Sequence, residues 1–302
     1  MDEESLPSRY RSPRFMKKTI LFRIGISLLA AGILYVGFQF FAPPLLAVFS
    51  GRARLTSSPE DWGYTYENIE IRKTGARANI WYLHHPNASA QIILLAHNGG
   101  NRSVPLLRWT AELLYSGGFS VALADPRGQG DTGGIKTYGF GEAVDVVAVI
   151  DELEVRYPEL PIGGFGYSLG AATIIRVMGM DERLLAAAAF APYSRFDSAL
   201  LRQELIFQTN GTWDGDGLLL PLISAAFRMW AFSSRKIPEP IDAAVSLADR
   251  ELLLMHFTGD PELPSAYSKE MYAAAAGENV QLELYGGTAH LPWRRTNTFE
   301  AD

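Results

Sequence analysis

A serine framed by two glycines constrains the fold of this chain more than any other feature. An apolar run from Leu160 leads into the pentapeptide Gly166-Tyr167-Ser168-Leu169-Gly170, and a helical pattern of small and aliphatic residues follows. This order predicts a strand, a sharp turn and a helix. In a strained turn with G-x-S-x-G spacing, the two glycines remove side chains that would collide. Ser168 would then be exposed at the carboxyl edge of a sheet, and the Leu169 N–H at the helix start could stabilise an oxyanion.

Composition narrows the class of protein further. The chain has 302 residues, and the roughly 250 that follow the N-terminal region suit one α/β domain with a substantial core. No cysteine is present, which excludes a disulfide framework, a thiolate nucleophile and a cysteine zinc site. The net charge of −6 divides into +5 for residues 1–54 and −11 for the rest. An acidic body argues against a nucleic-acid partner, whereas the basic end suggests an anionic membrane surface.

The N-terminal region has the pattern of a membrane anchor. Residues 1–18 form a polar, basic tail, and Ile24–Phe49 is a run of 26 residues without a charge. Its first part, Ile24–Ala42, would span about 28 Å as a helix, close to the thickness of the hydrocarbon core. We therefore expect a single-pass transmembrane anchor at 19–49. Because the basic residues precede it, the N-terminus would be cytoplasmic and the catalytic body extracytoplasmic. A cleaved signal peptide and a buried helix remain as alternatives.

Strand and helix patterns alternate after a linker at 50–64. An antiparallel edge hairpin is predicted at 66–71 and 78–84, followed by strands at 91–96, 119–124, 184–190, 251–257 and 280–285, and the strand that leads into Ser168 lies between those at 119–124 and 184–190. Helical patterns at 104–116, 141–157 and 265–276 separate them, together with the helix that begins at Leu169. The alternation predicts an α/β fold with a mostly parallel, doubly wound sheet. Its functional loops should gather at the carboxyl ends of the strands, where His97–Asn101, Asp125–Asp131 and Ser168 are expected.

One segment interrupts this rhythm and sets the domain limits. Residues 193–246 contain scattered helical stretches rich in Leu, Phe and Trp, which predicts a helical cap insertion over the site. An ordinary surface helix pair is the alternative. We expect the catalytic domain to cover 65–295 and a short C-terminal tail to cover 296–302.

A serine nucleophile needs a base, and that base needs an acid. Of the five histidines, only His290 lies in a loop just after the last predicted strand, which fits the chain order serine, acid, histidine. Asp260 follows the strand after the insertion and is the predicted acid. Glu262 and Asp197 remain as weaker candidates for the acid.

With these residues in place, the chain resembles the serine-hydrolase branch of the α/β-hydrolase superfamily. It is similar to the membrane-anchored, serine aminopeptidase-like and prolyl-oligopeptidase-like members, over roughly residues 65–295. The resemblance rests on four motifs: Asn98-Gly99-Gly100-Asn101-Arg102-Ser103, Asp125-Pro126-Arg127-Gly128-Gln129-Gly130, Gly166-Tyr167-Ser168-Leu169-Gly170, and His256 to Pro264.

The resemblance also implies an oxyanion hole. In related enzymes the third residue of the loop His-Gly-Asn-Gly/Ala-Gly donates its backbone N–H to the oxyanion. Asn98 has that place here, so the implied donors are the amides of Asn98 and Leu169. The sequence departs from the family in having Ala96-His97 where His-Gly is usual, and His97 could narrow the hole or add a donor. Arg127 is expected to brace the loops.

These residues together predict a membrane-anchored serine hydrolase. It would cleave an ester or thioester with an acyl or lipid-like group through Ser168, His290 and Asp260, by an acyl-enzyme that water resolves. No metal or organic cofactor is needed for this chemistry. A serine peptidase or aminopeptidase of the same fold is the first alternative, and a catalytically silent binding scaffold is the second.

Overall fold

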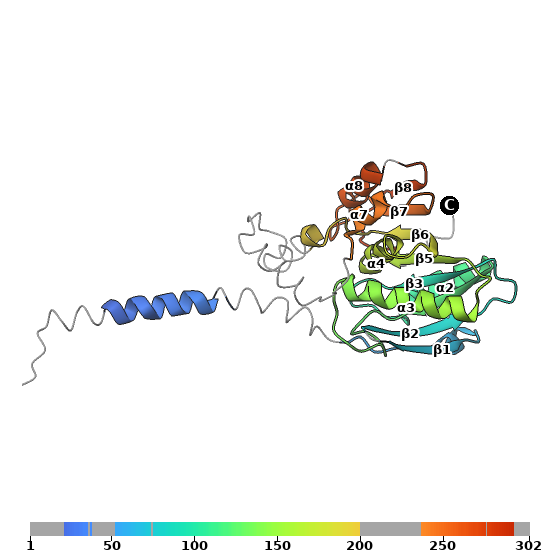
Figure 1. Cartoon of the computed structure of the whole chain (residues 1–302), viewed down its shortest axis with the longest axis horizontal. Helices are drawn as coiled ribbons and strands as arrows, with labels where there is room; N and C mark the ends of the chain where they lie inside the picture. Colours follow the sequence, from blue (N-terminus) through green and yellow to red (C-terminus); the bar gives the residue numbers. More distant parts are fainter. Residues whose placement is uncertain are drawn as a thin grey trace, which may run out of the picture.

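The body of the protein is built on one eight-stranded, mostly parallel sheet (Figure 1). The computed structural model describes residues 21–35, 37, 52–73, 75–199, 237–275 and 277–292. The strand order is β1-β2-β4-β3-β5-β6-β7-β8, in which only the β1–β2 and β2–β4 pairs are antiparallel. The strands are β1 Glu67–Lys73, β2 Ala76–Leu83, β3 Ala90–Leu95, β4 Phe119–Ala124, β5 Ile162–Tyr167, β6 Leu184–Phe190, β7 Glu251–Phe257 and β8 Val280–Tyr285.

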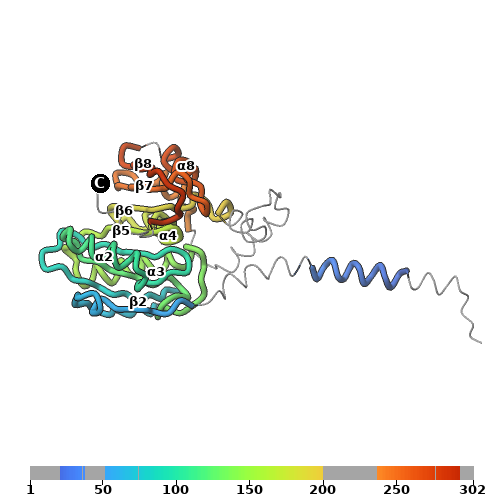
Figure 2. The backbone as a smooth tube through the Cα atoms, turned by 180° about the vertical axis from the view of Figure 1, so that it is seen from behind, coloured from blue at the N-terminus to red at the C-terminus, as the bar shows by residue number. Residues whose placement is uncertain are grey.

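Helices cover both faces of this sheet. They are α2 Pro105–Ser116, α3 Phe140–Arg156, α4 Leu169–Met178, α7 Pro240–Val245 and α8 Ala266–Ala275, with a 3-10 turn η1 at Pro59–Trp62. One core cluster lies beneath α3, α4, α7 and α8, and a second lies beneath α2 and the buried Trp62 of η1. The view from behind shows the sheet running from β2 at the bottom to β8 at the top (Figure 2).

The predicted α/β-hydrolase fold is confirmed, and each predicted strand is present within about two residues of its expected ends. The strands were predictable because burial leaves a clear pattern of apolar residues in the sequence. Strands covered on both faces, such as β3 and β4, are nearly continuous apolar runs. In β5, a Cβ at Gly163 would lie 2.8 Å from an Ile92 side-chain carbon, and one at Gly164 would lie 2.8 Å from Ile174. These glycines therefore allow close packing on each side of the strand that leads to Ser168.

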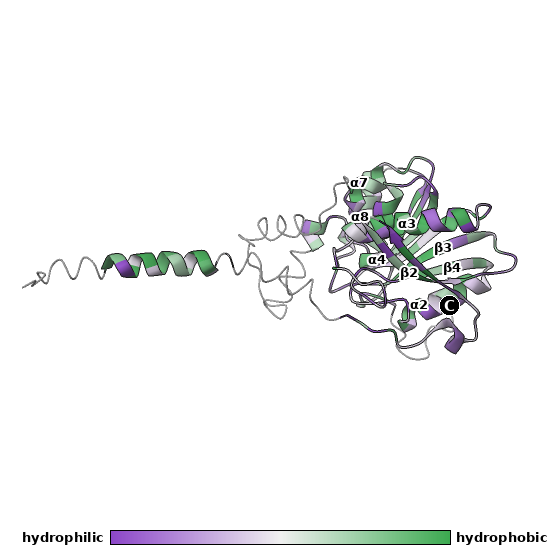
Figure 3. Cartoon of the chain, turned by 60° about the horizontal axis from the view of Figure 1, so that its bottom comes forward, coloured by the Kyte–Doolittle hydropathy of each residue, from purple (hydrophilic) through white to green (hydrophobic). Residues whose placement is uncertain are grey.

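The N-terminal helix covers residues 21–35 and is mostly hydrophobic (Figure 3). Among the described residues, no helix has both the length and the apolar character needed to cross a membrane. Much of the predicted anchor lies outside the described residues, as do the tail at 1–18, the centre of the predicted cap at 200–236 and the tail at 296–302.

Candidate active site

The turn between β5 and α4 presents Ser168 in a strained conformation. Ser168 has φ +52° and ψ −112°, in a region that non-glycine residues rarely adopt. A Cβ at Gly166 would lie 2.4 Å from the Gly170 carbonyl group, and one at Gly170 would lie 2.5 Å from the Ala96 carbonyl oxygen. Both neighbours are backbone atoms that cannot move aside. The turn therefore requires both glycines of the motif, as the sequence predicts.

Ser168, His290 and Asp260 form one continuous hydrogen-bonded chain. The Ser168 Oγ lies 2.8 Å from His290 Nε2, and His290 Nδ1 lies 2.6 Å from Asp260 Oδ2. All three residues are buried. The fold thus brings together groups separated by 122 and 30 positions in the chain. In this arrangement Nδ1 donates to the carboxylate, which leaves Nε2 able to accept the serine proton.

The second oxygen of Asp260 is held by the backbone. Asp260 Oδ1 accepts hydrogen bonds from the N–H groups of Glu262, at 2.8 Å, and Leu263, at 3.0 Å. Burial alone would raise the pKa of Asp260. However, hydrogen bonds from His256 and His290, together with the Leu263 N–H, hold that pKa well below its usual range. Asp260 is therefore a carboxylate at any working pH.

His256 is a contact of the acid that the sequence analysis did not identify. Its Nε2 lies 3.2 Å from Asp260 Oδ2 and 2.9 Å from the Leu263 carbonyl oxygen. Because both neighbours are acceptors, Nε2 carries a proton. Nδ1 lies 2.8 Å from the Ser268 hydroxyl, which can donate to it. His256 is thus a buried donor to Asp260. The four-residue spacing from Asp260 across the end of β7 was the available sequence signal.

The two alternative acids are placed differently. The side chain of Glu262 is 57% exposed, and its carboxylate reaches only to 4.0 Å from His290 Nε2, the nitrogen that faces Ser168. Within the described ranges, no hydrogen bond or ion pair joins Asp197 to His290. The geometry therefore favours Asp260 as the partner of His290.

Asn98 and Leu169 line a pocket with Ser168, as the predicted oxyanion hole requires. The pocket has about 360 Å³ of space, counting its opening to solvent. In the part of the chain that the structure describes, neither backbone N–H of these two residues donates a hydrogen bond. The remaining walls are mostly apolar or aromatic: Tyr138, Tyr193, Phe196, Ala199 and Leu263.

His97 is not among the residues that line this pocket, and it forms a hydrogen bond within its own loop. Its Nδ1 donates to the Asn98 carbonyl oxygen at 2.9 Å, and a Cβ at Gly100 would lie 3.1 Å from the ring. Burial lowers the pKa of His97, and the charge of His290 lowers it further. His97 is thus a neutral imidazole that supports the loop rather than a wall of the pocket.

The loops at the carboxyl edge are tied together by buried ion pairs. Arg102 contacts Asp125 at 2.7 Å and Asp131 at 2.8 Å, and the first pair is almost fully buried. Arg127 forms a two-pronged pair with Asp145 of α3, at 2.6 and 2.7 Å. The bracing role expected for Arg127 is therefore seen.

Among the described residues, no cluster of three or more His, Cys, Asp or Glu side chains could hold a metal ion.

Comparison with solved structures agrees with this fold. An esterase of Pyrococcus furiosus, Pf2001, is 22% identical with a TM-score of 0.63, and the match covers 78% of this chain and 88% of that chain. Pyrococcus horikoshii acylaminoacyl peptidase is 17% identical with a TM-score of 0.59, over 75% of this chain and 38% of that one. Est1E from Butyrivibrio proteoclasticus is 17% identical with a TM-score of 0.52, over 74% of this chain and 90% of that chain. A search of curated proteins found no match.

The sequence also matches a protein-family model, which shows family membership in addition to similarity of fold. The family model described as serine aminopeptidase, S33, matches residues 87–241, which is half of the chain and includes Ser168 and its turn. Asp260 and His290 lie beyond the matched region. The chain is accordingly a serine hydrolase of the α/β-hydrolase fold and belongs to the serine aminopeptidase S33 family.

Proposed function

We propose that this enzyme cleaves an ester or thioester with an acyl or lipid-like group, with Ser168 as nucleophile, His290 as base and Asp260 as the acid that orients it. The observation that carries the proposal is the unbroken chain of hydrogen bonds from Ser168 Oγ to Asp260. Ser168 lines a pocket together with Asn98 and Leu169, the two residues whose backbone amides are expected to bind an oxyanion.

Each step of the reaction has a group in place. Ser168 Oγ attacks the carbonyl carbon while His290 Nε2 takes the hydroxyl proton, and Asp260 stabilises the resulting imidazolium. The N–H groups of Asn98 and Leu169 bind the negative oxygen of the tetrahedral intermediate. The intermediate collapses to an acyl-enzyme as His290 gives the proton to the leaving alcohol or thiol. Water, deprotonated by the same histidine, then attacks the acyl-enzyme and releases the carboxylic acid product, and the proton returns to Ser168.

The pocket walls favour an acyl group over the end of a peptide. An aminopeptidase must bind a charged amino terminus, and buried charges need a partner. None of the described residues that line the pocket with Ser168 carries a charge. Aromatic and aliphatic walls instead suit a hydrocarbon chain. We therefore expect long-chain esters to be cleaved faster than short, soluble ones.

A peptidase is the second candidate function. It is supported by the family's description and by the similarity to an acylaminoacyl peptidase, whose name refers to a blocked amino terminus. Such a substrate would not require a charged partner in the pocket. Turnover of peptide amides that exceeds turnover of esters would favour this candidate over the first.

The first experiment is labelling with a fluorophosphonate probe. We expect the detergent-solubilised wild type to be labelled and the Ser168→Ala and His290→Ala variants not to be. A panel of p-nitrophenyl esters of increasing chain length, alongside peptide anilides, then separates the two candidates. A well-folded wild type that shows no labelling and no turnover would refute the proposal and favour a silent binding scaffold.

We also propose that residues 19–49 anchor the enzyme in a membrane, with the N-terminus cytoplasmic and the catalytic domain on the other side. The support is the uncharged run of 26 residues and the basic residues before it. We expect the full chain to resist extraction by alkaline carbonate and the catalytic domain to be protease-accessible only from the extracytoplasmic side. N-terminal sequencing of the mature protein that starts after this run would show a cleaved signal peptide instead.

A further inference from the structure

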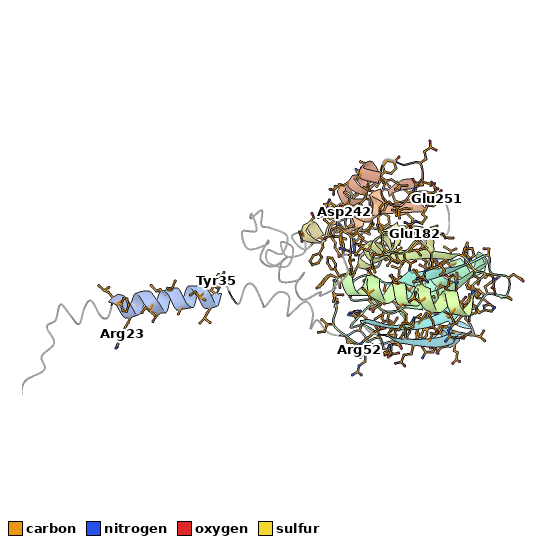
Figure 4. The ribbon with its side chains drawn as sticks, viewed as in Figure 1. Arg23, Tyr35, Arg52, Glu182, Asp242 and Glu251 are labelled. Atoms are coloured by element: carbon orange, nitrogen blue, oxygen red, sulfur yellow. The ribbon has the colours of Figure 1, made fainter. Side chains whose placement is uncertain are left out.

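The segment that precedes the catalytic domain is bound to two loops at the edge of the sheet where Ser168 lies. Residues 52–58, called here the N-terminal strap, lie across the two loops at the carboxyl edge of the sheet. On the loop at 125–131, Ala53 N donates to Gln129 Oε1 at 2.9 Å, and Gly130 N donates to the Ala53 carbonyl oxygen at 3.0 Å. Arg52 Nε donates to the Gly130 carbonyl oxygen. In Figure 4, Arg52 lies at the left end of the body, whereas Glu251, the first residue of β7, lies farther right.

The same strap binds the loop that carries Asn98. Asn101 Nδ2 donates to the carbonyl oxygens of Ala53, at 3.1 Å, and Arg54, at 2.9 Å. Thr56 N donates to Ser103 Oγ at 2.9 Å, and the two hydroxyl groups lie 3.2 Å apart. The strap therefore joins the loop after β4 to the loop after β3, and β3 is the strand next to β5 and Ser168.

Asn101 is the residue through which the strap reaches the loop. It is 2% exposed. Its Oδ1 accepts from the backbone N–H of Ser103, at 2.8 Å, and from the Ser103 hydroxyl, at 2.7 Å. Its Nδ2 is occupied by the two strap carbonyl groups. One carboxamide thus fixes the end of the loop and its distance from the strap at the same time.

Within the loop, the backbone around Asn98 is held by two hydrogen bonds, from His97 Nδ1 to the Asn98 carbonyl oxygen at 2.9 Å and from Gly100 N to the His97 carbonyl oxygen at 3.0 Å. Gly99 and Gly100 stand between Asn98 and Asn101, and Gly99 has φ +79°. Glycine is the residue with the most backbone freedom to lose on ordering. Besides these internal bonds, the position of the Asn98 N–H depends on the anchors at the two ends of the loop. These are β3 on one side, and Asn101 with Arg102 on the other.

We propose that the N-terminal strap is a working part of the active site, and that it positions the Asn98 N–H through Asn101. The proposal rests on the proposed function, because it assigns Asn98 to the oxyanion hole. Asn101 is a positioning residue in this account, since it touches no reacting atom.

The test uses full-length variants on both sides of the contact. Ala53→Pro removes the N–H that binds Gln129 and restrains the preceding residue, which displaces the strap. Asn101→Asp keeps an oxygen for Ser103 but directs another at the two strap carbonyl groups. Thr65→Pro is the matched control. Thr65 is exposed, whereas Ala53 is half-buried; both lie outside helices and strands, and the Thr65 N–H has no hydrogen bond within the described residues.

Loss of an oxyanion donor lowers kcat by about 10²- to 10³-fold, so partial displacement of one donor should lower it by about tenfold. We expect this fall in kcat for Ala53→Pro and Asn101→Asp, with KM within twofold of wild type. Inhibition by a trifluoromethyl ketone, whose adduct with Ser168 places an oxyanion in the hole, should weaken by the same factor as kcat/KM. The pH profile should be unchanged, because His290 and Asp260 are not touched.

Three outcomes decide the matter. Ala53→Pro and Asn101→Asp with kcat within twofold of Thr65→Pro would overturn the proposal. It would also be overturned if kcat, KM and the pH profile all shifted together with a lower melting temperature, because that indicates general loosening. A wild type without ester turnover and without probe labelling would instead overturn the proposed function, which keeps the two failures distinct.

Discussion

Replacing Asp260 with asparagine tests the assignment of the acid most directly. Four hydrogen-bond donors surround this carboxylate: the N–H groups of Glu262 and Leu263 at Oδ1, and His290 and His256 at Oδ2. An asparagine has only one acceptor oxygen, so two of the four donors must face its NH₂ group. If the oxygen stays with the two backbone N–H groups, His290 has to accept at Nδ1. Its Nε2 then carries the proton and cannot act as the base for Ser168.

The expected loss follows from this change of tautomer. In serine hydrolases a tautomer switch of this kind lowers kcat by about 10⁴-fold, so we expect a fall of about 10³- to 10⁴-fold for Asp260→Asn. At about 1.36 kcal/mol per factor of ten, that is about 4 to 5.5 kcal/mol of lost transition-state stabilisation. The variant should also unfold more easily, since a buried donor left unsatisfied costs about 1 to 3 kcal/mol.

The linkage of stability to pH provides a second, independent readout. The pKa of Asp260 in the folded enzyme is held below its unfolded value, so its stabilising contribution is complete above about pH 4. That contribution is lost as the pH falls through the folded pKa. We therefore expect the stability difference between wild type and Asp260→Asn to be constant from about pH 5 to 8 and to narrow in more acidic solution.

The assay is steady-state hydrolysis of a p-nitrophenyl ester, with urea unfolding measured on the same preparations. Glu262→Gln is the matched control, since it neutralises a neighbouring carboxylate whose side chain is 57% exposed. It should keep kcat within about twofold of wild type. If Asp260→Asn kept kcat within tenfold of wild type, or if Glu262→Gln lost more activity than Asp260→Asn, the assignment of the acid would be refuted.

Three further substitutions test other parts of the structure. Gly170→Ala places a Cβ 2.5 Å from a backbone carbonyl oxygen, so urea unfolding should show a loss of about 1 to 3 kcal/mol or more, whereas Gly286→Ala, with open space around it, should not. Arg102→Met leaves the buried carboxylate of Asp125 without its ion-pair partner and should cost about 3 to 5 kcal/mol of unfolding free energy; a loss below 1 kcal/mol would contradict this. The pKa of His97 is lowered by burial, so its stabilising contribution is full above about pH 6.5 and declines as the pH falls. The melting temperature of wild type should accordingly drop relative to His97→Gln between pH 7 and pH 5, and parallel curves would show that His97 does not titrate in this way.

Local pattern predicted the fold well because most of the signals are short-range. The period of the apolar residues identifies each strand and helix, and the two glycines around Ser168 reflect clashes with backbone atoms only a few positions away or on the adjacent strand. His290 and Asp260 were predicted from their order after the last strands, and the geometry places His290 beside Ser168 and Asp260 beside His290. The order was informative because parallel strands bring their carboxyl ends to one edge.

Contacts between distant segments were beyond the reach of such patterns. His256 has the sequence pattern of an apolar strand residue, and although it is only four residues from Asp260, their contact depends on how the chain turns after β7; its other ring nitrogen contacts Ser268 of α8, twelve residues on. Residues 52–58 have the composition of a linker, yet their backbone groups are bound by Asn101, Gln129 and Ser103. Such bonds depend on where two loops meet, and a backbone carbonyl group has no side chain to mark it.

The sequence by itself therefore determined the class of fold, the nucleophile and the order of its partners, because periodicity and glycine spacing act within a few residues. The tertiary structure decided which carboxylate meets His290 at Nδ1, which way His97 turns and what holds the loop of Asn98. These depend on distances of 2.6 to 3.1 Å between groups that lie from one to 48 residues apart, set by side-chain direction and packing.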